Sequence, residues 1–255
     1  MFLEIDGLRI NVDRAGAGDP VVLLHGWGAS ARSLAPVVQT LCRSYSVTAL
    51  DFPGFGLSQQ PSAPWGVYEF AQFVRHAMAR LEIKRTHLLG HSHGGRVSIM
   101  LAAQSPELVD KLILVDSAGI RPPRTLRLRA RGLTARTGRR ILSHRLAGGP
   151  GRRALTALYG RLGMADYRDS GPMRPTFIKV VNEDLGSLLP SIQAPTLVVW
   201  GAEDEETPVW MGERMAREIP RARLLVLERA AHFPYLDERE AFDRALTQFL
   251  AEEVR

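Results

Sequence analysis

A serine between glycines offers a nucleophile in the segment Gly90-His91-Ser92-His93-Gly94. The segment follows an apolar run over residues 86–89 and precedes a helix-like stretch over residues 96–103. We therefore expect it to form a tight turn between a strand and a helix. A serine on such a turn has strained backbone angles, and its neighbours two positions before and after must be small. The two glycines meet this requirement, so Ser92 is a candidate nucleophile for acyl transfer.

A serine nucleophile needs a base, and the base needs a carboxylate to orient it. For a serine on a strand-to-helix turn, the partners follow in the chain order Ser, acid, His. Asp204 comes just after an apolar run over residues 196–200, and His232 comes after a run over residues 223–227. Both would lie at carboxyl ends of strands, where the three side chains can meet. The sequence therefore predicts a catalytic triad of Ser92, Asp204 and His232.

Other carboxylates could replace Asp204 as the acid. Its neighbours Glu203, Glu205 and Glu206 are close in the chain, and Asp116 follows an earlier apolar run. We favour Asp204 because it lies three residues after Gly201 in the segment Trp200-Gly201-Ala202-Glu203-Asp204.

The developing oxyanion needs two hydrogen-bond donors. One should be the backbone N–H of His93, the residue after the nucleophile. The other should come from the loop His25-Gly26-Trp27-Gly28, where glycines such as Gly26 let the backbone approach a substrate, and we expect the Trp27 N–H. We interpret His25 as a residue that holds this loop in place.

The elements that must position these residues are short apolar runs alternating with helix-like stretches, which is typical of a mostly parallel sheet covered by helices. A hairpin opens the pattern, and six runs follow at residues 21–24, 46–50, 86–89, 112–115, 196–200 and 223–227. Nearly all their residues are apolar, as expected for strands buried on both faces. The fold class is therefore α/β, with a mostly parallel, twisted, eight-stranded sheet flanked by helices.

About eighty residues separate the sixth and seventh strands, far more than one crossover helix needs. We expect a helical, arginine-rich lid over residues 118–189, inserted after the sixth strand, with residues 1–117 and 190–255 forming the core. Such a lid would lie over the strand ends where α/β sheets bind ligands.

These motifs resemble those of the α/β-hydrolase superfamily over nearly the whole chain. The resemblance rests on segments 25–28, 51–58, 90–95, 200–204 and 231–233. It implies the α/β-hydrolase fold, Ser92, Asp204 and His232 as the triad, and Trp27 and His93 as oxyanion donors. Within the superfamily the chain is most similar to small esterases and meta-cleavage-product C–C hydrolases. Ser92 argues against haloalkane dehalogenases and epoxide hydrolases, which carry aspartate at this position.

The charge is concentrated in the predicted lid. The chain has 33 Lys and Arg against 27 Asp and Glu, a net charge of +6. Residues 121–169 contain thirteen arginines and two aspartates and have a net charge of +11. The remaining residues together have a net charge of −5. We favour a solvated lid, with recognition of a carboxylate or phosphate by Arg96 and lid arginines as the alternative. No aromatic platform accompanies the charge, so we expect no nucleic-acid partner.

Composition excludes several other classes. No apolar stretch approaches the ~18–20 residues of a membrane span, so we expect no stable membrane insertion. Acidic residues near the N-terminus and a single cysteine, Cys42, favour a cytoplasmic protein without disulfides. Gly54-Phe55-Gly56 lacks the third glycine of a dinucleotide site, and we expect neither a cofactor nor a metal.

The sequence thus predicts a serine hydrolase that cleaves a carboxylic ester of a small molecule through an acyl-enzyme. Two alternatives stay open. The same triad could hydrolyse or eliminate across a C–C bond of a carboxylated substrate, or the scaffold could be a small-ligand receptor without turnover.

Overall fold

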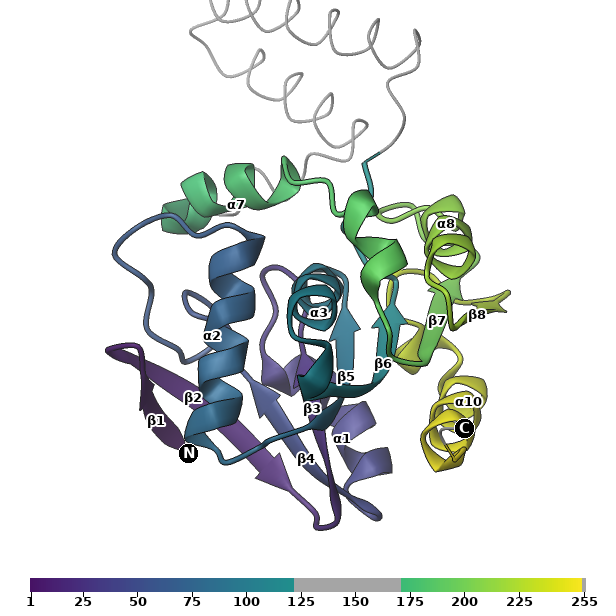
Figure 1. Ribbon diagram of the computed structural model, residues 1–255, viewed down its shortest axis with the longest axis horizontal. Coiled ribbons are helices and arrows are strands. Elements are labelled where there is room, and N and C mark those ends of the chain that lie inside the picture. Colours follow the sequence, from purple (N-terminus) through teal and green to yellow (C-terminus); the bar gives the residue numbers. More distant parts are fainter. Residues whose placement is uncertain (122–170, 254–255) are drawn as a thin grey trace, which may run out of the picture.

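The computed structural model of the protein describes residues 1–121 and 171–253. Its strands form one eight-stranded sheet in the order β1-β2-β4-β3-β5-β6-β7-β8, antiparallel at the β1–β2 and β2–β4 pairings and parallel elsewhere (Figure 1). The strands are β1 (Phe2–Ile5), β2 (Leu8–Ala15), β3 (Asp19–Leu24), β4 (Tyr45–Leu50), β5 (Thr86–His91), β6 (Val109–Val115), β7 (Thr196–Gly201) and β8 (Ala222–Leu227). The predicted α/β class and mostly parallel sheet are confirmed.

Helices cover both faces of this sheet. Alternate residues of each central strand belong to two separate apolar clusters, as the period of two in a strand requires. One cluster includes residues of α2 (Val67–Arg80), α3 (His93–Gln104) and α8 (Trp210–Glu218), and the other includes residues of α1 (Ala35–Leu41), α9 (Pro234–Asp237) and α10 (Arg239–Ala251). Across the described ranges, no helix is long and apolar enough to span a bilayer.

The apolar spacing of the sequence correctly places two of these helices. Apolar residues spaced three and four apart predict one helix stripe at Val67, Phe70, Val74, Met78 and Leu81; the first four are buried along α2, and Leu81, just past its end, is half-buried. Phe242, Leu246 and Leu250 are likewise buried along α10. Hydrophobic burial of one helix face therefore fixes how each helix packs on the sheet.

Only the two ends of the predicted lid belong to the described residues. Residues 122–170, which hold most of the predicted lid and of the arginine cluster, lie outside them, so the lid boundaries at 118 and 189 stay a prediction. The described end contains η3 (Gly171–Met173), α7 (Arg174–Val181) and η4 (Gly186–Ser191). The Trp65 N–H donates to Thr176 Oγ1 over 3.2 Å, and the rings of Trp27 and Phe177 lie 5.1 Å apart. Helix α7 therefore packs on the loop that follows β3.

A buried lysine joins the sheet to the last helix. Lys111 lies in β6, and its ammonium group donates to the carbonyl oxygens of Phe249, Leu250 and Glu252. The carbonyls at a helix C-terminus lack partners within the helix and attract cations. Lys111 therefore satisfies the end of α10 and fixes it against the strand.

Candidate active site

Ser92 lies on a sharp turn between β5 and α3. Its backbone has a φ of 52° and a ψ of −111°, in the left-handed region that serine seldom adopts. Its N–H donates to the Val115 carbonyl over 3.0 Å, which holds the turn against β6. A Cβ atom at Gly90 would collide with the Gly94 carbonyl, and one at Gly94 with the Leu24 carbonyl. The strand–turn–helix interpretation is thus correct, and glycine is required at both positions.

Asp204 and His232 form a buried hydrogen-bonded pair. His232 Nδ1 lies 2.7 Å from Asp204 Oδ2, which also accepts the Thr207 hydroxyl at 2.6 Å. The backbone N–H groups of Glu206 and Thr207 donate to Asp204 Oδ1 at 2.8 and 3.0 Å. Burial would raise the pKa of Asp204, but the hydrogen bonds from His232 and Thr207 outweigh it and lower the pKa to about 2. Asp204 is therefore ionised and oriented toward His232.

A second histidine connects this pair to the serine. His91, the residue before Ser92, lies with Nε2 2.8 Å from the His232 carbonyl oxygen, and the two imidazole rings are 4.9 Å apart. Burial, together with the neighbouring His232, lowers the pKa of His91 to about 3, so His91 is neutral and donates this hydrogen bond. The contact holds the loop after β8 against the turn that carries Ser92.

The loop after β3, which carries the predicted oxyanion donor Trp27, lies beside Ser92. His25 donates from Nδ1 to the Gly26 carbonyl over 2.7 Å, and its Nε2 accepts the Phe52 N–H over 3.0 Å. Burial lowers the pKa of His25 to about 4, so this neutral imidazole holds the loop, as expected. A Cβ atom on Gly26 would be 3.3 Å from Ser92 Cβ. Gly26 thus lies directly beside the candidate nucleophile.

Trp27 and His93, the two predicted donors, pack together. Their rings are 5.3 Å apart, and the buried His93 ring also contacts Phe52 and Phe70. Burial among these rings lowers the pKa of His93 well below its usual range, so its imidazole is uncharged. His93 is the first residue of α3, where a backbone N–H has no partner within the helix.

Arg96 does not have the orientation expected of a substrate-binding residue. Its Nη1 lies 3.3 Å from the Val180 carbonyl oxygen and 3.2 Å from that of Glu183. The guanidinium therefore joins α3 to the chain at the end of α7. These contacts describe a packing role, and they give no support to carboxylate recognition by Arg96.

The side chain of Asp116, the alternative acid, bonds the end of β7. Its Oδ1 accepts the Gly201 N–H over 2.9 Å, and its Oδ2 is buried with no hydrogen-bond partner within residues 1–121 and 171–253. Burial, reinforced by the Asp204 carboxylate, raises the pKa of Asp116 to about 9. Asp116 is therefore a neutral carboxylic acid at pH 7, whereas the ionised Asp204 holds the histidine.

The raised pKa of Asp116 predicts that Asp116→Asn stabilises the protein increasingly as the pH rises. From the ordinary value of 3.8 up to about 9, the unfolded state ionises Asp116 and the folded state does not, so the wild type loses stability over this range. Asparagine removes the loss and keeps an oxygen for the Gly201 N–H. The free energy of unfolding at pH 7 should rise by up to about 4 kcal/mol, with little change at pH 4.

Urea unfolding of both proteins at pH 4, 7 and 8.5 measures this gain. The control is Asp13→Asn, which removes one negative charge from an exposed position of β2. A gain that is equal at all three pH values, or equal in the control, would contradict the prediction.

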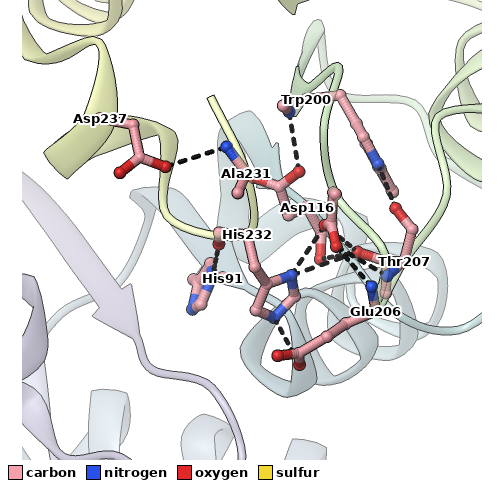
Figure 2. A network of polar contacts seen from close by, with 10 residues as sticks. His91, Asp116, Trp200, Glu206, Thr207, Ala231, His232 and Asp237 are labelled. Carbon is pink, nitrogen blue, oxygen red and sulfur yellow. Dashed lines mark hydrogen bonds and ion pairs between the residues drawn. The ribbon is translucent and has the colours of Figure 1, made fainter. Parts of the chain in front are cut away.

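Sequence reasoning missed two contributors to this site. His91 has no signal in the local sequence, because its contact with the His232 carbonyl depends on a loop 141 residues away. Thr207 had a local signal. Asp204 stands three residues before Thr207, which a proline follows, and this spacing is typical of an aspartate whose carboxylate caps a helix-like turn. Its carbonyl also accepts the Trp200 indole N–H at 2.6 Å, which anchors the turn (Figure 2).

The comparisons with known proteins agree with this geometry. The family described as the alpha/beta hydrolase fold matches residues 19–239. The chain is 31% identical to a 2-hydroxymuconate semialdehyde hydrolase of Pseudomonas putida, over 96% of this chain and 92% of the relative. It is 30% identical to a pimeloyl-[acyl-carrier protein] methyl ester esterase of Chromobacterium violaceum, over 95% of this chain and 98% of that one.

Solved structures give the same result. An esterase from Exiguobacterium antarcticum superimposes with a TM-score of 0.76 at 25% identity, covering 98% of this chain and 99% of that one. The matched family, the sheet order and the glycine-flanked serine turn all describe one architecture. The chain belongs to the α/β-hydrolase fold family and is an enzyme of the hydrolase type.

Proposed function

We propose that this hydrolase cleaves carboxylic esters of small molecules through an acyl-enzyme on Ser92. The observation that carries the proposal is the buried Asp204–His232 pair, joined through His91 to the strained turn that presents Ser92. An ionised aspartate on Nδ1 leaves Nε2 as the basic nitrogen of the imidazole. This is the arrangement that an alcohol nucleophile needs at neutral pH.

The reaction proceeds in two halves. Ser92 Oγ attacks the ester carbonyl carbon as His232 Nε2 takes its proton, and the backbone N–H groups of Trp27 and His93 stabilise the oxyanion. The C–O bond then breaks, and His232 returns the proton to the departing alcohol. Water repeats the sequence on the acyl-enzyme, releasing the carboxylic acid and restoring Ser92.

C–C bond hydrolysis is the second candidate, because one relative is a semialdehyde hydrolase. The sequence argument for it is recognition of a substrate carboxylate by Arg96 together with arginines of the predicted lid, most of which lie outside the described residues. Since the Arg96 guanidinium bonds the carbonyls of Val180 and Glu183, that argument is weakened, and we rank ester cleavage first.

A combined labelling and turnover experiment tests the proposal. A fluorophosphonate should label the protein at one residue per chain, identified as Ser92 by peptide mass spectrometry. p-Nitrophenyl acetate, butyrate and octanoate should be turned over, and pre-labelled protein should be inactive. Faster cleavage of a vinylogous diketo acid than of every ester would favour the C–C hydrolase. Tight ligand binding without labelling or turnover would favour a receptor.

A further inference from the structure

A second carboxylate approaches the catalytic histidine from the side opposite Asp204. Glu206 Oε2 lies 3.5 Å from His232 Nε2, whereas Asp204 contacts Nδ1 (Figure 2). The Glu206 N–H donates to Asp204 Oδ1, so the backbone of this residue is fixed to the triad. Its side chain is 63% exposed, which places the carboxylate at the solvent-facing rim of the site.

This position is on the substrate side of the imidazole. In the proposed reaction Nε2 takes the proton of Ser92 and returns it to the departing alcohol, so a group beside Nε2 is near that alcohol. In the part of the chain that the structure describes, Glu206 has no lysine or arginine partner. Among the described residues, no lysine or arginine therefore neutralises the Glu206 carboxylate when the alcohol part of an ester approaches.

We propose that Glu206 determines the charge preference for the alcohol part of the ester, favouring cationic or neutral alcohols over anionic ones. The inference rests on the proposed function and adds to it the class of leaving group. Asp204 carries the same sign of charge but is buried beside Nδ1, so Glu206 supplies the exposed negative charge at the rim.

Coulomb's law gives the size of the effect. Unit charges roughly 6–8 Å apart change a rate by about 2-fold in a water-like dielectric and by up to about 100-fold at an effective dielectric constant of about 20. Because the Glu206 side chain is mostly exposed, we expect about 3- to 10-fold for each unit charge on the alcohol.

The test compares three butyrate esters whose alcohols are choline, the neutral isostere 3,3-dimethylbutanol, and glycolate. The quantity measured is the ratio of kcat/KM between Glu206→Gln and wild type for each ester, because this ratio cancels the intrinsic reactivity of the alcohols. Relative to the ratio for the neutral ester, which contains any effect of Glu206 on the His232 imidazole, we expect the ratio to fall about 3- to 10-fold for the choline ester and to rise by a similar factor for the glycolate ester. The differences should shrink at 1 M NaCl, since screening acts on exposed charges.

Glu205→Gln is the matched control. It removes the same charge from the neighbouring exposed residue, and all three ratios should stay within about twofold. Equal ratios for the three esters in Glu206→Gln, or the same pattern in Glu205→Gln, would overturn the inference. Either of these two results leaves the proposed function intact, provided that the wild type hydrolyses the esters and Ser92→Ala does not. Absence of hydrolysis of every ester by the wild type would overturn the proposed function and this inference together.

Discussion

Ser92→Ala is expected to lower kcat for p-nitrophenyl butyrate by about 10⁶-fold, the size of loss seen when the nucleophile of a serine hydrolase is removed. The physical reason is that no other hydroxyl lies on the strained turn between β5 and α3. A residual rate of about 10³- to 10⁴-fold over water should persist from substrate binding and the oxyanion donors. Steady-state kinetics with freshly purified protein measures both quantities.

Ser98→Ala is the control for this loss. Ser98 lies in the same helix, and its buried hydroxyl donates to the Gly94 carbonyl over 2.8 Å. Its removal costs about 1 kcal/mol of stability and should leave kcat within about threefold. Thermal unfolding curves of Ser92→Ala that match those of the wild type would show that Ser92→Ala is folded. Activity of Ser92→Ala within tenfold of wild type would exclude Ser92 as the nucleophile.

Asp204→Asn is expected to lower kcat by about 10⁴-fold. Asparagine has nearly the shape of aspartate but no charge, so it cannot stabilise the imidazolium of His232. Its amide can also turn a donor toward Nδ1, which favours the unreactive tautomer of the imidazole. The Thr207 contacts at 2.6 and 3.0 Å should keep the loop in place.

Asp116→Asn distinguishes the two acids. Because the Asp116 side chain bonds the Gly201 N–H, whereas Asp204 bonds His232 Nδ1, we expect replacement of Asp116 to leave kcat within about threefold while it raises stability. The reverse result, a large loss in Asp116→Asn and a small one in Asp204→Asn, would transfer the role of acid to Asp116. The same two proteins therefore test the site through activity and through unfolding.

The sheet could be predicted from sequence because its central strands are buried on both faces and have to be apolar. Polar strand segments could not be found in this way. Asp13 and Arg14 of β2 pair with β4 although their side chains are charged and exposed, and β6 begins at Val109, before Asp110 and Lys111. Lys111 is tolerated there only because α10, more than 130 residues later, accepts its hydrogen bonds. Local patterns carry no information about such a partner.

The candidate site divides in the same way. The sequence predicts that Ser92, Asp204 and His232 each follow a strand. Because parallel strands bring their carboxyl ends to one edge of the sheet, it also predicts that the three residues lie at the same edge. The direction of the Arg96 guanidinium was not readable, because it depends on how α7 packs over α3. The approach of Glu206 to His232 depends likewise on the turn that Asp204 and Thr207 build between them.

The buried ammonium of Lys111 has a practical consequence for attaching this enzyme to supports. The chain has three lysines, and Lys111 is enclosed with its protons engaged, whereas Lys84 and Lys179 are exposed. Coupling reagents directed at primary amines will therefore react with those two side chains and the amino terminus. Lys179 lies on α7, paired with Glu69 of α2 at 3.0 Å, so conjugation there would disturb a helix that packs beside Trp27. A Lys179→Arg protein would direct side-chain coupling to Lys84, which follows the end of α2.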